Sequence, residues 1–238
     1  EALISSSNSS TNWALSKRLK LQLPEGCNFS GCKAKENTYD KVVDMFIENY
    51  KDVEFKPNCG INLDGMGFSK PRGMNFRIVR FHEVGHVGSI FANDDQLKEQ
   101  LFWGRLNELI EEMGTISMGR MLSWLPGDFE KNKAVHFYSI IPEDPVKFKS
   151  AHDKFLNSVG NYFDGKTVGY GTIDVNSADG ATHWVALSTN YEDGGFIQLH
   201  HDLENKFGKQ QMEWAKTNGG VEIVDEYSIH VHASFPKN

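Results

Sequence analysis

Long apolar runs and clusters of basic residues are both missing from this 238-residue sequence. A membrane-spanning helix needs about 20 consecutive apolar residues, and no segment approaches that length. The formal net charge is -7, from 25 Lys and Arg against 32 Asp and Glu, which argues against a nucleic-acid footprint or a polybasic membrane contact. These absences predict a soluble protein with no membrane insertion and no nucleic-acid partner.

Signature motifs of several common enzymes are also absent. The sequence has no glycine-rich phosphate loop with its lysine and no nucleophile elbow, so nucleotide hydrolysis and the common pattern of serine hydrolysis are excluded. Cysteine is scarce: Cys27, Cys32 and Cys59 all lie in the first quarter of the chain. Because an odd number of cysteines cannot all form disulfides, one bridge with a free thiol and three reduced thiols both stay open.

The N-terminal residues are polar. Residues 1–16 are rich in Ser and Asn, a composition that predicts a flexible tail. The first residue is Glu1 rather than methionine, which is compatible with a processed N-terminus and with secretion. The sequence therefore leaves the compartment open.

The most informative feature that is present is an internal repeat of secondary-structure order. In the second half, residues 134–238, Asp144 followed by Pro145 marks the start of one helix, and a second helix ends near Asn218. Alternating and β-branched residues predict four strands around these helices, at residues 134–141, 166–175, 182–189 and 221–235. The order is β-α-β-β-α-β.

The first half, residues 17–126, has the same order. Helices are predicted over residues 39–50 and from Asn93 to Gly114. The strands are predicted at residues 19–23, 60–68, 74–81 and 116–125, with a cysteine-bearing insertion after the first of them. Loops at residues 69–73 and 176–180 occupy matching places in the two halves, and the polar residues 127–133 form the linker between them.

This repeat predicts the fold class. Each βαββαβ unit forms a four-stranded antiparallel sheet with both helices on one face, so the open faces of two units can cover each other. The expected protein is α+β, with two tandem ferredoxin-like units that form a pseudo-dimeric α/β barrel, either as a monomer with an internal pseudo-dimer or as a higher oligomer. The alternative is two unrelated α+β halves.

From about Lys17 onward, this order of elements resembles the dimeric α/β-barrel, ferredoxin-like superfamily. That superfamily includes antibiotic-biosynthesis monooxygenases, stress-response barrel proteins and the haem-binding chlorite-dismutase relatives. No signature motif accompanies the resemblance, so it implies a fold rather than an activity. It also implies a ligand cavity between a sheet and its helices, and the many aromatic residues would suit a small apolar or aromatic molecule there.

The sharpest local pattern is His230-Val231-His232 in the last predicted strand. Side chains two residues apart share a face of a strand, and neighbouring imidazoles can bind a divalent metal or act as acid and base. We therefore predict His230 and His232 as catalytic and metal-binding residues, although a polar strand face turned to solvent would show the same pattern. The opposite face is apolar and comprises Tyr227, Ile229, Val231, Ala233 and Phe235.

A second histidine cluster follows a strand of the first half and contains His82, Glu83 and His86. It has a superficial likeness to a zinc-protease helix, but Gly85 and Gly88 favour a loop, so we reject that interpretation. A loop at the end of a strand can still aim binding residues. His82 and His86 are therefore further candidate catalytic residues.

The leading hypothesis is a small-molecule enzyme of the α/β-barrel type, a monooxygenase, isomerase or lyase, acting on a largely apolar substrate. His acid-base or metal-assisted chemistry would be used, with His183 as the fifth candidate histidine and Glu83 or Glu226 as an orienting carboxylate. A divalent metal is the favoured cofactor, and haem is less favoured because no motif specifies it. The alternatives are a non-catalytic binding or carrier protein and a structural protein with a filled core.

The two halves differ at the His-x-His strand. The corresponding strand of the first half offers Arg120, Met121 and Leu122 instead. If the halves began alike, their sites have diverged, so one functional pocket is expected rather than two.

Overall fold

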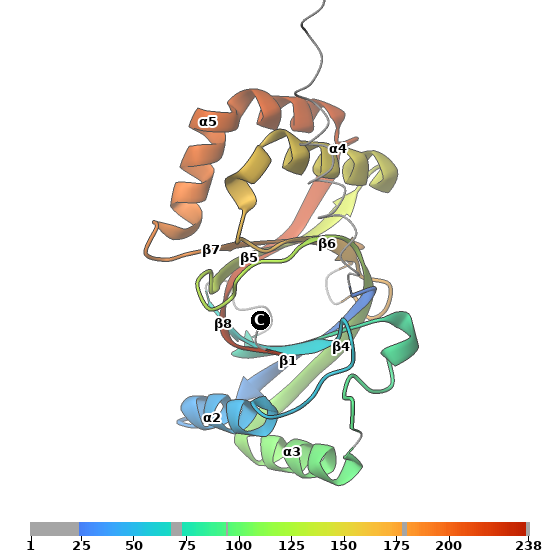
Figure 1. Cartoon of the computed structure of the whole chain (residues 1–238), viewed down its shortest axis with the longest axis vertical. Coiled ribbons are helices and arrows are strands. Elements are labelled where there is room, and N and C mark those ends of the chain that lie inside the picture. The colour runs from blue at the N-terminus through green and yellow to red at the C-terminus, as the bar shows by residue number, and fades with distance from the viewer. Residues whose placement is uncertain (1–23, 68–72, 94, 178–179, 237–238) are drawn as a thin grey trace, which may run out of the picture.

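A computed structural model describes residues 24–67, 73–93, 95–177 and 180–236. Within these residues, eight antiparallel strands close into a single barrel. Two α-helices lie on one side of the barrel and two on the opposite side (Figure 1). None of the described helices is long and apolar enough to cross a membrane.

The elements of the first half come in the order β-α-β-β-α-β. They are β1 (Gly26–Ala34), α2 (Tyr39–Tyr50), β2 (Gly60–Met66), β3 (Phe76–His82), α3 (Gln96–Leu109) and β4 (Ile110–Leu125). A short 3-10 helix, η2 (Val84–His86), connects β3 to α3. The side chain of Asp95 caps α3 by accepting a hydrogen bond from the backbone N–H of Lys98.

The second half repeats that order. Its elements are β5 (Ala134–Pro142), α4 (Pro145–Ser158), β6 (Val168–Thr172), β7 (His183–Thr189), α5 (Gly195–Thr217) and β8 (Val221–Phe235), with a 3-10 helix, η3 (Gly160–Phe163), after α4. As the sequence predicts, Asp144 caps α4 and Pro145 is its first residue.

The strand order around the barrel is β1-β3-β2-β8-β5-β7-β6-β4, closed by the pairing of β4 with β1. Each half contributes four consecutive strands, and the halves join through the β2–β8 and β4–β6 pairs. Strands β4 and β8 are long, at 16 and 15 residues, because each pairs with a strand of its own half along its first part and with a strand of the other half along its last part. The α+β class and the barrel of two ferredoxin-like units are confirmed.

Strand β1 covers a segment for which the sequence analysis predicted no strand. Residues 19–23 lie outside the described residues, and strand β1 is instead the cysteine-bearing segment predicted as an insertion. A register shift between Ser30 and Cys32 interrupts its pairing with β4. Cys27 packs in the barrel interior and Cys32 on the helix side, as alternation along a strand requires for residues an odd number of positions apart. All three cysteines are buried and free.

The end of α3 was also predicted wrongly. The helix ends at Leu109, five residues before Gly114, and β4 begins at once. Cys32 pairs with Met113, and Ala34 with Ile110, across the β1–β4 ladder. The helical spacing of Met113 is therefore overridden by strand pairing. Residues 69–72 and 178–179 of the two predicted hairpin loops, and Asp94, lie outside the described residues.

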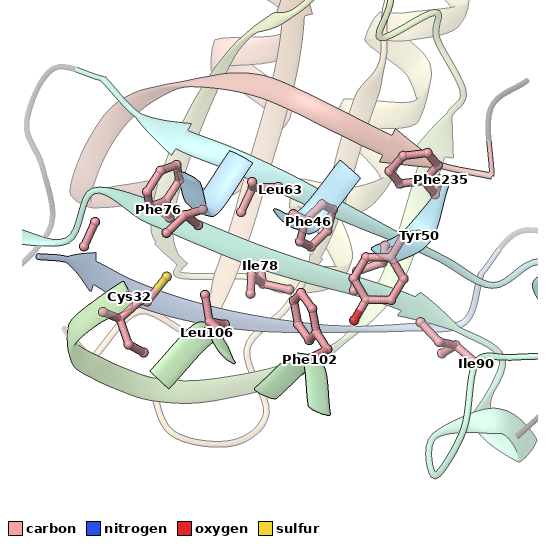
Figure 2. Packing of buried hydrophobic residues seen from close by; sticks show 14 of the residues in the cluster. Cys32, Phe46, Tyr50, Leu63, Phe76, Ile78, Ile90, Phe102, Leu106 and Phe235 are labelled. Atoms are coloured by element: carbon pink, nitrogen blue, oxygen red, sulfur yellow. The ribbon is translucent and has the colours of Figure 1, made fainter. Parts of the chain in front are cut away.

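Two kinds of core hold the structure together. On the first-half helix side, Phe46 and Tyr50 from α2 and Phe102 from α3 pack onto the sheet (Figure 2). Each such fully buried side chain contributes about 1.5–3 kcal/mol. Inside the barrel, the side chains of both halves meet and include Phe29, Val135, Phe137, Trp184, Ile229 and Val231.

The barrel interior also contains a buried ion pair. Arg77 Nε and Nη2 donate hydrogen bonds to Asp64 Oδ2 over 3.0 and 2.8 Å. Its Nη1 donates to the hydroxyl of Tyr227 over 3.1 Å, and the guanidinium carbon lies 4.6 Å from the ring centroid of Phe137. This network joins β2 and β3 of the first half to β5 and β8 of the second.

Candidate functional site

A cavity of about 250 Å³ lies between the second-half sheet and helices α4 and α5. Residues of strands β5, β6, β7 and β8 form its floor, and residues of the two helices and η3 form its roof. Its walls are mostly apolar and aromatic and include Tyr138, Ile140, Phe148, Val185, Leu203 and Trp214. We call it the apolar cavity. Helix α5 bends over it, because Phe207 has non-helical backbone angles (φ -127°, ψ 21°).

Two residues with strongly polar side chains line this wall, Gln211 on α5 and His152 on the buried face of α4. His152 is 6% exposed, and its Nε2 atom has no hydrogen-bond partner among the described residues. Burial lowers the pKa of the imidazole from 6.5 to about 4, because the charged form loses its hydration. At neutral pH, His152 is therefore an uncharged imidazole with an unused nitrogen in an apolar wall.

His152 belongs to a small aromatic cluster. Its ring centroid lies 5.6 Å from that of Tyr170 on β6, whose hydroxyl is also buried without a partner in the described part of the chain. Tyr170 also contacts Phe148, at 5.2 Å, and His183, which stacks on it at 5.6 Å with an interplanar angle of 9°. His183 Nδ1 is 2.8 Å from Thr182 Oγ1. The predicted His183 thus lies in the same sheet-helix layer as His152.

Sequence reasoning missed His152, which the sequence analysis did not list as a candidate. The signal was available, because His152 follows Phe148 by four residues and lies beside Ala151 on the stripe that predicted the helix. A histidine on the buried stripe of an amphipathic helix needs either a partner or a function.

His230 and His232 lie elsewhere, on the outer surface of the barrel near the β2–β8 junction. Their ring centroids are 5.0 Å apart. His232 Nε2 is 2.7 Å from the Tyr39 hydroxyl, and His230 stacks on Tyr191 at 5.9 Å. Burial lowers the pKa of both imidazoles, that of His232 to about 4. Gly65 permits this packing, because a Cβ there would lie 2.4 Å from both His232 Nε2 and the Tyr39 hydroxyl.

The predicted apolar face of this strand is divided between two cores. Ile229 and Val231 point into the barrel, whereas Ala233 and Phe235 pack under α2. A bulge causes the change of face, because Leu63 and Asp64 on β2 pair with Ala233 and Val231, which leaves an extra residue between them. The strict alternation assumed from the sequence is therefore wrong at this point.

The metal prediction for His230 and His232 stays a prediction. Within the described residues, no group of three or more His, Cys, Asp or Glu side chains could hold a metal ion. A metal bound there would take two imidazoles from the protein and complete its coordination with water or another ligand.

His82 and His86 occupy a third location. His82 Nε2 is 3.2 Å from Asn28 Oδ1, and its Nδ1 is 3.1 Å from the carbonyl oxygen of Glu83. His86 lies in η2, with Nδ1 3.5 Å from Cys59 Sγ. The structure therefore distributes the five predicted histidines over three separate places. Neither predicted carboxylate orients one of them closely: Glu83 Oε2 is 3.7 Å from His86 Nδ1, and Glu226 faces His136 at 4.0 Å.

The first half has a cavity of its own, of about 400 Å³, between its sheet and α3. Strands β1, β3 and β4 line it, which are the counterparts of β5, β7 and β8. Its walls comprise Asn28, Ser30, Ile78, Arg80, Trp103, Asn107, Met113 and Ile116. We call it the polar cavity. The two halves thus carry two cavities in matching positions.

Comparison with known proteins gives the fold a name. No family model and no curated protein sequence matches this chain. Among solved structures, a candidate monooxygenase of Lactobacillus acidophilus NCFM has a TM-score of 0.60 at 13% identity, over 88% of this chain and 95% of its own. The chain has the dimeric α/β-barrel fold.

Two further solved structures have a similar fold. A candidate monooxygenase of Fusobacterium nucleatum has a TM-score of 0.55 at 12% identity, covering 90% of this chain and 95% of its own. An anthrone oxidase-like protein has a TM-score of 0.53 at 7% identity, covering 90% and 93%. At these identities the likeness establishes the fold alone.

Proposed function

We propose that this dimeric α/β barrel is a small-molecule enzyme that binds a largely apolar organic molecule in the apolar cavity. The observation that carries the proposal is the unpartnered, buried Nε2 of His152 in a largely apolar wall. Binding sites for small molecules characteristically combine such walls with a few polar groups that fix orientation. Because the barrel closes within one chain, we expect the monomer to be active.

The size of the apolar cavity suits a molecule of two or three fused rings. Its volume of about 250 Å³ exceeds the roughly 150 Å³ that holds benzene in a designed cavity. It lies just below the range of about 300–1,000 Å³ for drug-sized ligands. The rings of Tyr138, Phe148 and Trp214 in its walls would pack against an aromatic ligand.

His152 would act on the ligand as an uncharged imidazole. With Nδ1 carrying the proton, Nε2 can accept a hydrogen bond from a ligand hydroxyl or accept a proton from an acidic C–H group. Its lowered pKa makes the imidazole a weak base, so its first contribution is orientation of the ligand. A carbon acid that gives a stabilised anion is the substrate type such a base can deprotonate.

The names of the structural neighbours suggest a reaction to test first. Anthrone has two acidic hydrogens on one ring carbon. Its oxidation by O₂ converts this CH₂ group to a carbonyl: one oxygen atom enters the product, and the other leaves as water with both hydrogens. We expect His152 to take the first proton in this step.

The experiment measures O₂ consumption and anthraquinone formation with anthrone as the substrate. The purified protein should accelerate both. A His152→Phe variant should lose most of this acceleration, since removal of a general base typically costs about 100-fold or more. A Val185→Phe variant, which fills the apolar cavity, should lose ligand binding as well.

The matched control is His136→Phe. His136 is a half-buried histidine of the same half, but it stacks on Phe196 at 3.9 Å and is not part of the cavity wall. The His136→Phe variant should bind and oxidise anthrone as the wild type does. If anthrone and naphthalene both fail to bind, or bind equally well to Val185→Phe, the proposed cavity function is wrong.

A carrier protein is the second candidate, and the low pKa of His152 favours it. A base with a pKa of about 4 is well suited to accept a hydrogen bond and poorly suited to remove a proton at neutral pH. Tight binding of an aromatic probe, with no turnover of it in the wild type, would favour the carrier over the enzyme.

A further inference from the structure

The polar cavity of the first half differs from the apolar cavity in its charge. Arg80 is the one charged side chain among the described residues that line it. On β3, Ile78 and Arg80 line this cavity where β7 contributes Val185 and Leu187 to the apolar one. A cation thus occupies a place that is aliphatic in the other half.

The apolar part of the wall lies beside this cation. The guanidinium carbon of Arg80 is 5.4 Å from the ring centroid of Trp103. Ile78, Met113 and Ile116 add an aliphatic surface, and Met113 and Ile116 are 38% and 51% exposed. The cavity therefore offers a cation next to an open apolar surface, a combination that suits an amphipathic anion.

A carboxylate of the protein itself is already bound to Arg80. Glu99, in the first turn of α3, accepts hydrogen bonds at Oε1 from Arg80 Nη2 and, over 2.9 Å, from Trp103 Nε1. The ion pair is only partly buried, with side chains 28% and 25% exposed, so its net stabilisation is small and it can exchange. An Arg guanidinium has donors for more than one carboxylate oxygen.

We propose that the polar cavity is a second ligand site, and that it binds an organic acid whose carboxylate pairs with Arg80 while its apolar body lies on Trp103, Met113 and Ile116. Without a ligand, the carboxylate of Glu99 pairs with the guanidinium of Arg80, and it therefore competes with the carboxylate of the ligand. Asn28 supports the floor, held by its hydrogen bond from His82. This site is independent of the apolar cavity and of any reaction there.

The test compares 2-naphthoate with its neutral analogue 2-naphthamide by isothermal titration calorimetry. The Val185→Phe background keeps naphthyl groups out of the apolar cavity. We expect the acid to bind and the amide to bind at least about tenfold more weakly, as for loss of a hydrogen bond between charged groups. Arg80→Gln should abolish the preference for the acid.

Glu99→Gln gives the sharper result, because it should strengthen binding of 2-naphthoate by removing the competing charge. Arg105→Gln, on the exposed side of α3, is the matched control and should bind like the parent. Circular dichroism melting checks that each variant is folded. Equal binding of acid and amide, full binding by Arg80→Gln, or no binding of the acid even by Glu99→Gln would each overturn the proposal.

Discussion

The two halves of this barrel share one order of strands and helices but differ in the space under their helices. The apolar cavity is bordered mostly by aromatic and aliphatic side chains, with an uncharged histidine, His152, and Gln211. The polar cavity contains Arg80 and two asparagines. The same scaffold therefore offers two chemically different sites, because the side chains that line the sheet can change without altering the strand pairing that forms the barrel.

The largest expected effect is a loss of stability, and its measurement also shows whether the two halves unfold together or separately. Arg77→Leu should destabilise the protein by about 3–5 kcal/mol, because Asp64 would be left as a buried charge without its partner. Since the network also touches Phe137 and Tyr227 of the second half, both halves should unfold in one transition. Urea denaturation followed by circular dichroism and tryptophan fluorescence measures this.

The control for that measurement is Arg120→Leu. Arg120 also bridges the halves, through hydrogen bonds of 2.9 and 3.0 Å to Asp174, but its side chain is 63% exposed. Its loss should cost less than about 1 kcal/mol. Two separate transitions in Arg77→Leu would show that the halves are independent domains.

An intermediate loss of folding stability is expected at acidic pH, and it should originate in the second half. Folding lowers the pKa of His152 from 6.5 to about 4, so the unfolded chain takes up this proton first as the pH falls. Stability is then lost between about pH 6.5 and pH 4. A shift of this size corresponds to about 3 kcal/mol.

His152→Phe should therefore lose much less stability than the wild type between pH 7 and pH 4, as measured by urea denaturation at both values. His201→Phe, at an exposed position on α5, is the control and should follow the wild type. His232 contributes in the same direction but less, because it is only half-buried. An unchanged acid response in His152→Phe would show that this imidazole is not buried uncharged.

The smallest expected effect concerns the His-x-His strand, which has no counterpart in the first half. We predict that His230 and His232 together bind Zn²⁺ weakly, since two protein ligands are fewer than the three or four of most zinc sites. Calorimetric titration should show binding that disappears in a His230→Ala, His232→Ala double variant. A His200→Ala, His201→Ala variant is the matched control, and equal binding by both variants would contradict the prediction.

The parts of the fold that were predictable from sequence are those with uninterrupted local signals. The cap Asp144 with Pro145, the helical stripe over residues 39–50 and the long strand β8 were all identified because each carries a strong signal in the local sequence. Strand β1 was treated as an insertion because its sequence, GCNFSGCKA, contains two glycines and no β-branched residue, which is a weak signal for a strand. In β8 a bulge divides the apolar face, and the sequence pattern gives no sign of it.

The candidate site was less predictable than the fold. Of the five predicted histidines, His183 alone lies in the layer that contains the apolar cavity, and it was listed on the weakest argument. The His-x-His pattern is real, but it places two rings against Tyr39 and Tyr191 outside the barrel. A short motif specifies which side chains share a face, and it does not specify what covers that face.

The sequence by itself determined the order of strands and helices, the repeat, and hence the barrel, because periodicity and caps are local properties of the chain. Only the tertiary structure decided which buried polar atoms stay without partners and where the helices leave space above the sheets. His152 Nε2 and Arg80 became candidates for this reason. Whether a side chain fills the core or lines a cavity depends on its neighbours from distant elements, and those contacts exist only after the barrel has closed.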